Sequence, residues 1–284
     1  MTRFYLFFAL LLCLTGCFKK ENEAWLKLYG TGSATIHWGD GSYDTKTLSP
    51  DGYTRFIHKY SNAAHRNITI SGENITTIDC TRNELTSLDV SDCIALTGLY
   101  CSSNQLTSLN VSNCIALTEL YCSSNQLISL NLSGLIALTT LICDGNQLTL
   151  LDVSGLIKLT RLYCSYNLLT DLIFNKNTEL QWLNCINNQL ISLDVSGCTA
   201  LTALQCRDNQ LTSLDMSKNS ALEYLLCGYN YMTAVELDYL FGTLNNTDEG
   251  KIHIWYNGPD YDSSGTNGCD RSIAENKGWT VVFE

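Results

Sequence analysis

Cysteine is the residue type that could do most chemistry in this chain, because fourteen are present and eight of them recur every 21 residues. A thiol can serve as a nucleophile, a metal ligand or half of a disulfide. An asparagine follows each regularly spaced cysteine by three residues, and two such columns in phase indicate an internal repeat. The cysteines are Cys80, Cys101, Cys122, Cys143, Cys164, Cys185, Cys206 and Cys227, and the asparagines are Asn83, Asn104, Asn125, Asn146, Asn167, Asn188, Asn209 and Asn230.

The even spacing favours buried, reduced thiols. If successive coils stack their strands in register, neighbouring Cβ atoms lie about 4.8 Å apart with parallel Cα–Cβ vectors. A disulfide needs about 3.5–4.5 Å and converging vectors, and one cysteine per coil supplies no tetrahedral metal cluster. Better disulfide candidates are Cys93, Cys114 and Cys198, which share a second column, whereas Cys269 has no obvious partner. The eight thiols are expected to pack as small hydrophobic groups.

The sequence contains no recognisable catalytic motif. Gly-x-Ser-x-Gly, His-Glu-x-x-His, a phosphate-binding loop and a nucleotide fingerprint are all missing. None of the four histidines lies in the repeats, so a hydrolytic site there would lack its usual base. His37, His58 and His65 precede the repeats and are interpreted as structural residues rather than metal ligands. We therefore expect a protein that is not an enzyme and that needs no cofactor.

The acidic residues give little evidence for a metal site. Asp260 and Asp262 begin a loop that resembles an EF-hand, but Arg271 occupies the position of the bidentate glutamate. That loop is interpreted as a surface turn, with calcium binding as the alternative. Asp40 and Gly41 form a good tight-turn pair. The net charge of −11 argues against a nucleic-acid partner, because phosphate backbones require clustered Lys and Arg.

The repeat resembles a known family. Leu96-x-x-Leu99-x-Cys101-x-x-Asn104-x-Leu106 is similar to the leucine-rich-repeat pattern L-x-x-L-x-L-x-x-N/C-x-L, and it recurs from Ile75 to about Tyr231. The period and the Leu-Asp-Val-Ser half-repeat resemble leucine-rich-repeat lipoproteins of the Bacteroidetes. The resemblance implies a β-rich solenoid: a right-handed coil with parallel strands over residues 75–231.

The spacing also predicts the geometry of one coil. Leu99, Tyr100 and Cys101 alternate as a short strand with Leu and Cys inward and Tyr outward. Leu106, Leu109 and Val111 give an inward set on the other side, so strand-like segments are expected on both sides of a fairly straight solenoid. Stacked coils bury these faces against one another. The asparagine column is expected to hydrogen-bond the backbone of its own coil and of the adjacent one.

Both flanks are expected to cap the solenoid, whose terminal coils would otherwise expose core and strand edges. Residues 25–74 form a β cap with strands predicted at 25–29, 34–38, 54–60 and 67–70. Its Trp38-Gly39-Asp40-Gly41-Ser42, His58-Lys59-Tyr60 and Ile68-Thr69-Ile70 segments resemble the polycystic-kidney-disease (PKD) type of β-sandwich. Residues 232–284 form a small α/β cap, with helices predicted at 233–244 and 270–277 and strands at 251–256 and 280–283.

The first residues form a targeting segment. Arg3 precedes an apolar run from Phe4 to Leu14 that is too short to span a bilayer. Leu14-Thr15-Gly16-Cys17 resembles the bacterial lipobox, which implies a signal peptide at 1–16, acylated Cys17 and a tether at 17–24. The resemblance implies secretion across the inner membrane and attachment by the lipid anchor alone to the outer membrane or surface of a Gram-negative bacterium.

Function is then expected on the outward face of the repeat strands. Aromatic and arginine side chains carry many binding hot spots, and a rigid sheet lowers the ordering cost of binding. We expect a non-enzymatic, cell-surface protein that binds an extracellular protein or peptide, or mediates adhesion, through this face. A glycan-binding role and a mainly structural envelope role are the alternatives. The candidate binding residues are Tyr100, Tyr121, Arg161, Tyr163, Tyr166, Trp182, Tyr224 and Tyr229.

Overall fold

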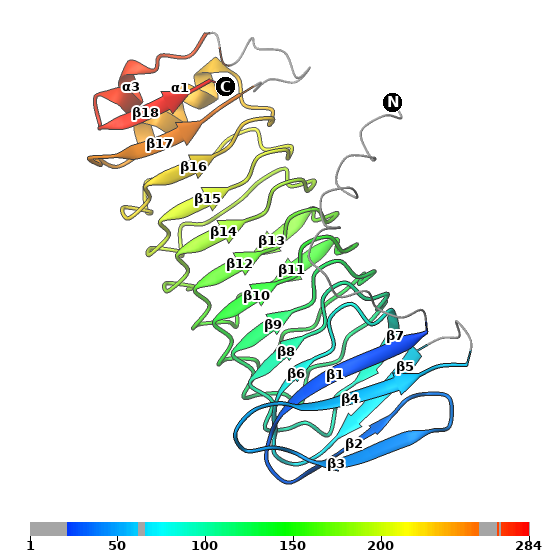
Figure 1. Cartoon of the computed structure of the whole chain (residues 1–284). Helices are drawn as coiled ribbons and strands as arrows, with labels where there is room; N and C mark the ends of the chain where they lie inside the picture. Colours follow the sequence, from blue (N-terminus) through cyan, green and yellow to red (C-terminus); the bar gives the residue numbers. More distant parts are fainter. Residues whose placement is uncertain (1–21, 62–65, 256–265, 267, 284) are drawn as a thin grey trace.

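The computed structural model describes residues 22–61, 66–255, 266 and 268–283. A 12-stranded sheet runs along the whole molecule in the order β18-β17-β16-β15-β14-β12-β10-β9-β8-β6-β1-β4 (Figure 1). Each repeat contributes one short strand, paired in parallel with the next. These strands are β6 (Ile75–Asp79), β8 (Gly98–Tyr100), β9 (Glu119–Tyr121), β10 (Thr140–Ile142), β12 (Arg161–Tyr163), β14 (Trp182–Asn184), β15 (Ala203–Gln205) and β16 (Tyr224–Leu226).

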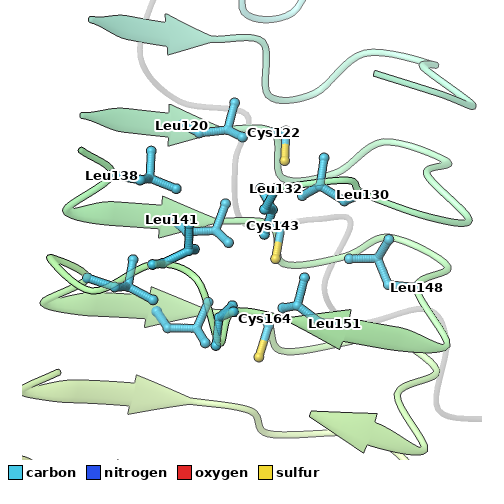
Figure 2. Close-up of a cluster of buried hydrophobic side chains, with 14 of the residues drawn as sticks. Leu120, Cys122, Leu130, Leu132, Leu138, Leu141, Cys143, Leu148, Leu151 and Cys164 are labelled. Carbon is cyan, nitrogen blue, oxygen red and sulfur yellow. The ribbon is translucent and has the colours of Figure 1, made fainter. Parts of the chain in front are cut away.

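The register of the sheet carries the 21-residue period into space. Leu99 pairs with Leu120, and Leu120 with Leu141, so identical positions of successive coils lie side by side. Figure 2 shows the result, with Leu120, Leu141 and the nearby cysteines stacked coil upon coil inside the solenoid. All of these side chains belong to one continuous hydrophobic core. The expected β-solenoid with parallel strands is confirmed.

The cysteine column lies inside this core, as the spacing predicts. All eight members are fully buried, and every cysteine in the described residues carries a free thiol. Burial raises the pKa of these thiols, to about 12 for Cys185 and Cys227. They therefore remain protonated and pack as small apolar groups. Cys93, Cys114 and Cys198 are also buried and free, whereas the free thiol of Cys269 is partly exposed.

The asparagine column ties adjacent coils together. Asn167 Nδ2 donates to Cys143 O and to Cys164 O, both at 3.1 Å, and Asn167 Oδ1 accepts from Leu148 N at 3.1 Å. The same pattern recurs along the column, as at Asn125 and Asn209. These side chains satisfy backbone groups that the turn between strand and back segment leaves unpaired inside the protein. Their predicted structural role is confirmed.

The back of the solenoid is less regular than expected. The inward residues Leu106, Leu109 and Val111 are buried as predicted. The described back segments, however, form ladders only at β7 (Leu85–Asp89), β11 (Leu150–Asp152) and β13 (Asp171–Ile173). Elsewhere the back segments are joined by isolated contacts, such as the bond from Gln126 N to Leu106 O at 2.8 Å and the single bridge between Asp89 and Asn110, which do not form a ladder.

The N-terminal cap extends both sides of the solenoid. Strands β1 (Glu23–Gly30) and β4 (Thr54–Lys59) join the large sheet, because β1 pairs antiparallel with β6. Strands β2 (Ser33–His37), β3 (Tyr43–Thr47) and β5 (Arg66–Ser71) form a second sheet with β7, the first back strand. Trp38, Ile36 and Phe56 are buried within the cap. Four of these strands match the predicted ranges to within two residues at each end, whereas β3 was not predicted.

The C-terminal cap continues the large sheet with β17 (Gly250–His253) and β18 (Trp279–Val282), covered by α1 (Ala234–Thr243) and α3 (Ser272–Glu275) (Figure 1). At the start of α1, Glu236 accepts a hydrogen bond from Thr233 N at 3.1 Å. At its end, Lys277 Nζ donates to the carbonyls of Gly242 and Leu244 at 2.6 and 2.8 Å. Among the described residues, no helix combines the length and hydrophobicity needed to span a bilayer.

Candidate functional site

The outward face of the large sheet is the surface on which the candidate binding residues gather. Each repeat strand turns one leucine inward, or Ile78 in β6, and the residues on either side of it outward. The register aligns these outward residues in two columns. The first column contains Thr77, Gly98, Glu119, Thr140, Arg161, Trp182, Ala203 and Tyr224, and the second contains Asp79, Tyr100, Tyr121, Ile142, Tyr163, Asn184, Gln205 and Leu226.

The predicted aromatic residues form pairs on this face. The rings of Tyr100 and Tyr121 meet edge to face, with centroids 4.9 Å apart. The rings of Tyr163 and Trp182 are stacked with an interplanar angle of 26° and centroids 6.3 Å apart. All four side chains are half-buried, and Arg161 is exposed beside Trp182 in the first column. Within each pair, contact between the two rings holds them in place. Because the four side chains are only half-buried, part of their surface stays accessible to a partner.

The tyrosine hydroxyls on this face are suited to binding rather than to proton transfer. Tyr100 Oη donates a hydrogen bond to Glu119. Burial and, after it, this hydrogen bond raise the pKa of Tyr100, and burial followed by the charge of Glu119 raises the pKa of Tyr121. Both phenols therefore stay protonated at physiological pH. They can donate and accept hydrogen bonds but cannot act as bases there.

Tyr166 and Tyr229 do not lie on the strands but in the turn that follows. Both have φ of 54°, the left-handed conformation that bulky residues seldom adopt. The same position is left-handed in other coils too, for example at Ser124 and Asn187, and Gly145 holds it at 65°. The conformation therefore belongs to the repeat itself. Tyr166 is 51% exposed, so its ring extends the candidate face beyond the strand ends.

The C-terminal end of the face contains three residues that sequence reasoning missed. The Arg207 guanidinium lies 4.5 Å from the Tyr229 ring centroid and 5.2 Å from that of Trp255. His253 lies 5.6 Å from Tyr224 and 5.7 Å from Trp255, measured between ring centroids. Helix α1 interrupts the 21-residue spacing before β17, so the repeat pattern did not reveal His253 and Trp255. The alternation of Ile252 and Ile254 around His253 was the available signal, because it matches the Leu-x-Cys strand of the repeat.

The N-terminal end of the face also gains residues that the sequence assigned to the cap alone. Because β1 pairs with β6, Lys27 lies opposite Asp79 and Tyr29 lies opposite Thr77. Trp25 and Lys27 are half-buried and Tyr29 is exposed, while the residues between them are buried. The candidate face therefore crosses from the repeats onto the cap without a break (Figure 1).

The cap motif brings a serine, a carboxylate and an imidazole together, but not in the order of a Ser-His-Asp triad. Asp40 accepts hydrogen bonds from Ser42 N at 3.0 Å and Ser42 Oγ at 2.5 Å, and Asp40 Oδ2 lies 2.7 Å from His58 Nε2. The serine therefore contacts the carboxylate and not the imidazole, which is not the order of a Ser-His-Asp triad. The His58 ring stacks on Trp38 with 4.9 Å between the ring centroids, so this motif has a structural role in packing the cap.

Metal binding finds little support in the structure. Within the ranges that the structure describes, no group of three or more His, Cys, Asp or Glu residues is placed to hold a metal ion. The calcium candidates Asp260 and Asp262, the lipidation candidate Cys17 and the signal peptide at 1–16 lie outside the described residues, as does His65. Their interpretations rest on sequence alone.

Comparison with known proteins identifies the fold. No protein-family model and no curated protein sequence matches the chain. Among solved structures, the chain is similar to the functional domain of InlJ from Listeria monocytogenes, described as including a cysteine ladder, at 28% identity and a TM-score of 0.50 over 72% of this chain and 54% of that one. It is also similar to an internalin, InlF, from the same organism, at 19% identity and a TM-score of 0.53 over 73% and 66% of the two chains.

These likenesses agree with a fold of the leucine-rich-repeat solenoid type. The cysteine ladder of the InlJ domain has a counterpart here in the buried column from Cys80 to Cys227. The chain spans about half of the InlJ structure and about two thirds of the InlF structure.

Proposed function

We propose that this protein binds an extracellular protein or peptide through the outward face of its large sheet and performs no catalysis. The carrying observation is the set of half-buried aromatic pairs, Tyr100 with Tyr121 and Tyr163 with Trp182, on a sheet whose repeat strands are each paired on both sides. A platform of this kind loses little conformational entropy on binding. Aromatic and arginine side chains on such a platform are the types that dominate binding energy.

The mixed charges of the face favour a protein partner. Glu119, Arg161 and Lys251 lie in the first column or its continuation on β17, within a few strands of the aromatic pairs. Oppositely charged groups around aromatic anchors set the orientation of a partner more than its affinity. Adhesion through this face is one form of the proposed activity.

A peptide-display selection tests the proposal. Random peptides are selected on the purified protein and then measured against a Tyr163→Ala/Trp182→Ala double variant. The matched control is Tyr43→Ala, because Tyr43 is 65% exposed on β3 of the other sheet. We expect selected peptides to bind the wild type and the control alike, and the double variant at least about tenfold more weakly, as loss of a hot spot implies.

Two results would contradict the proposal. One is that no peptide is enriched on the wild-type protein, which would favour a mainly structural envelope role. The other is that enriched peptides bind the double variant as well as they bind the wild type, while circular dichroism shows that the variant is folded.

We further propose that the protein is lipid-anchored at Cys17 on the surface of a Gram-negative bacterium, on the basis of the Leu14-Thr15-Gly16-Cys17 motif. Cys17→Ser should move the protein from the membrane fraction to the soluble fraction and abolish incorporation of labelled fatty acid. An unchanged distribution and an unchanged label would refute the anchor and leave the binding proposal standing.

A further inference from the structure

A hollow lies on the candidate face where the cap meets the first repeats. Tyr29, Thr77, Asp79 and Tyr100 line it, and its volume is about 390 Å³. The strand register explains the space. Tyr29 on β1 and Tyr100 on β8 flank β6, and the position beside Thr77 on β8 is Gly98, which has no side chain. We name this hollow the junction site.

Gly98 matters because the same column carries larger side chains in several later coils. A Cβ at this position would lie 3.3 Å from the Tyr100 ring and 3.4 Å from the Thr77 methyl group. Glu119, Arg161 and Trp182 occupy the equivalent positions on later strands. Gly98 therefore leaves room for the Tyr100 ring to lie close to the sheet beside Thr77, where the two side chains form one part of the lining of the junction site.

The polar groups of the junction site form a weakly coupled pair of opposite charges. Asp79 Oδ2 lies 3.7 Å from Lys27 Nζ, and Asp79 Oδ1 accepts from Thr81 N at 3.1 Å. The side chains of Lys27 and Asp79 are 33% and 26% exposed. Lys27 Nζ also lies 5.2 Å from the ring centroids of Trp25 and of Tyr53. A carboxylate acceptor and an ammonium donor are thus both within reach of the same bound molecule.

This charge arrangement selects for a neutral ligand. A cationic group would be repelled by Lys27 and by Arg55, which pairs with Lys27 across β1 and β4. An anionic group would be repelled by Asp79 and by Glu119, which accepts from Tyr100. Neutral hydroxyl groups avoid both costs, because one can donate to the carboxylate while its neighbour accepts from the ammonium.

We propose that the junction site binds a neutral sugar ring of a glycan. The apolar face of the ring packs on Tyr29 or Tyr100, whose rings bound the hollow, and adjacent hydroxyls bridge Asp79 and Lys27. The volume lies toward the lower end of the range of small-molecule sites, about 300–1,000 Å³, which suits one or two rings. The site is separate from the Tyr163 and Trp182 pair, so it adds a second ligand class to the proposed protein-binding function.

The test begins with an array of neutral, sialylated and sulfated oligosaccharides probed with the full chain. The strongest neutral oligosaccharide is then titrated by calorimetry against wild type, Tyr29→Ala and Thr77→Tyr. The second variant fills the hollow without altering Asp79 or Lys27. We expect neutral oligosaccharides to bind, affinity to fall at least about tenfold in both variants, and binding to change little with salt because no net charge is neutralised.

Controls separate this proposal from the one above. Tyr43→Ala, on the other sheet, should bind the oligosaccharide as the wild type does, and Tyr163→Ala/Trp182→Ala should do so as well. Circular dichroism checks that every variant is folded. The junction-site proposal is overturned if no neutral glycan binds, if only charged glycans bind, or if the variants lose binding only to selected peptides. None of these outcomes depends on whether the Tyr163 and Trp182 pair binds protein.

Discussion

Replacement of Asn167 by alanine should strongly destabilise the solenoid, because this side chain joins two coils in a buried position. Leu148 N donates to Asn167 Oδ1, and Asn167 Nδ2 donates to Cys143 O and Cys164 O. The alanine variant leaves the Leu148 N–H buried without that acceptor, which costs about 1–3 kcal/mol. Each lost donated bond costs about 1 kcal/mol, since each carbonyl keeps a second donor from a neighbouring asparagine. The sum is about 3–5 kcal/mol.

The assay is chemical denaturation under reducing conditions, followed by circular dichroism, with the midpoint and slope compared between variants. The matched control is Asn113→Ala. Asn113 also donates to the previous coil, to Ser91 O at 3.2 Å, but it is exposed. We expect the control to lie within about 0.5 kcal/mol of the wild type. If both variants are equally mild, the asparagine column does not stabilise the coil through buried backbone groups, and the reasoning fails.

A third variant, Asn167→Asp, tests the donor half separately. It keeps an acceptor for Leu148 N but places carboxylate oxygens against Cys143 O and Cys164 O, about 3.1 Å from the present amide nitrogen. Burial and these carbonyls should raise the pKa of the introduced acid above its unfolded value near 4. A raised folded-state pKa means that stability is greatest below the unfolded pKa and falls as pH rises toward neutrality. A variant that is equally stable at low and neutral pH would contradict this.

Three further predictions follow from the same structure. Gly197→Ala should destabilise the folded protein by about 1–3 kcal/mol, because the new Cβ would lie 1.9 Å from a backbone oxygen of the previous coil. The control is Gly155→Ala at the same repeat position, where a Cβ meets nothing within 4 Å and stability should not change. Equal denaturation midpoints for the two variants would contradict this. At mildly alkaline pH, only Cys269 among the described cysteines should react promptly with a thiol reagent, because the other eleven are buried. The labelled cysteines are identified by mass spectrometry. Label on any of the eleven buried cysteines in the native protein would be inconsistent with the fold. Hydrogen bonds from Ser42 lower the pKa of Asp40 to about 2. A lowered folded-state pKa contributes stability above the unfolded value near 4, and this stability is lost as pH falls toward 2. Asp40→Asn should therefore slightly reduce the loss of thermal stability at acid pH, and identical profiles of melting temperature against pH would exclude the contribution.

The repeat was predictable from sequence because its determinants are local and periodic. Leu99 and Cys101 alternate as a strand that turns both side chains inward, and this pattern returns every 21 residues without insertion. A stacked solenoid is then the arrangement that buries every copy, since one coil alone cannot. The buried cysteine column, the structural asparagines and the outward positions of Tyr100 and Tyr163 all follow from this periodicity. The roles of the candidate binding residues remain predictions.

The tertiary structure alone decided where the periodic face ends and what joins it. Lys27 lies opposite Asp79 only because β1 pairs with β6. These strands are about fifty residues apart in the sequence, and no local pattern specifies their pairing. His253 and Trp255 reach the face only because the chain returns after α1 to pair β17 with β16. Likewise, Gly155 and Gly197 occupy one repeat position, yet only Gly197 is crowded, by Asn175 O. Side-chain periodicity fixes which residues turn inward, but register between distant strands and close backbone approaches arise only when the coils are packed.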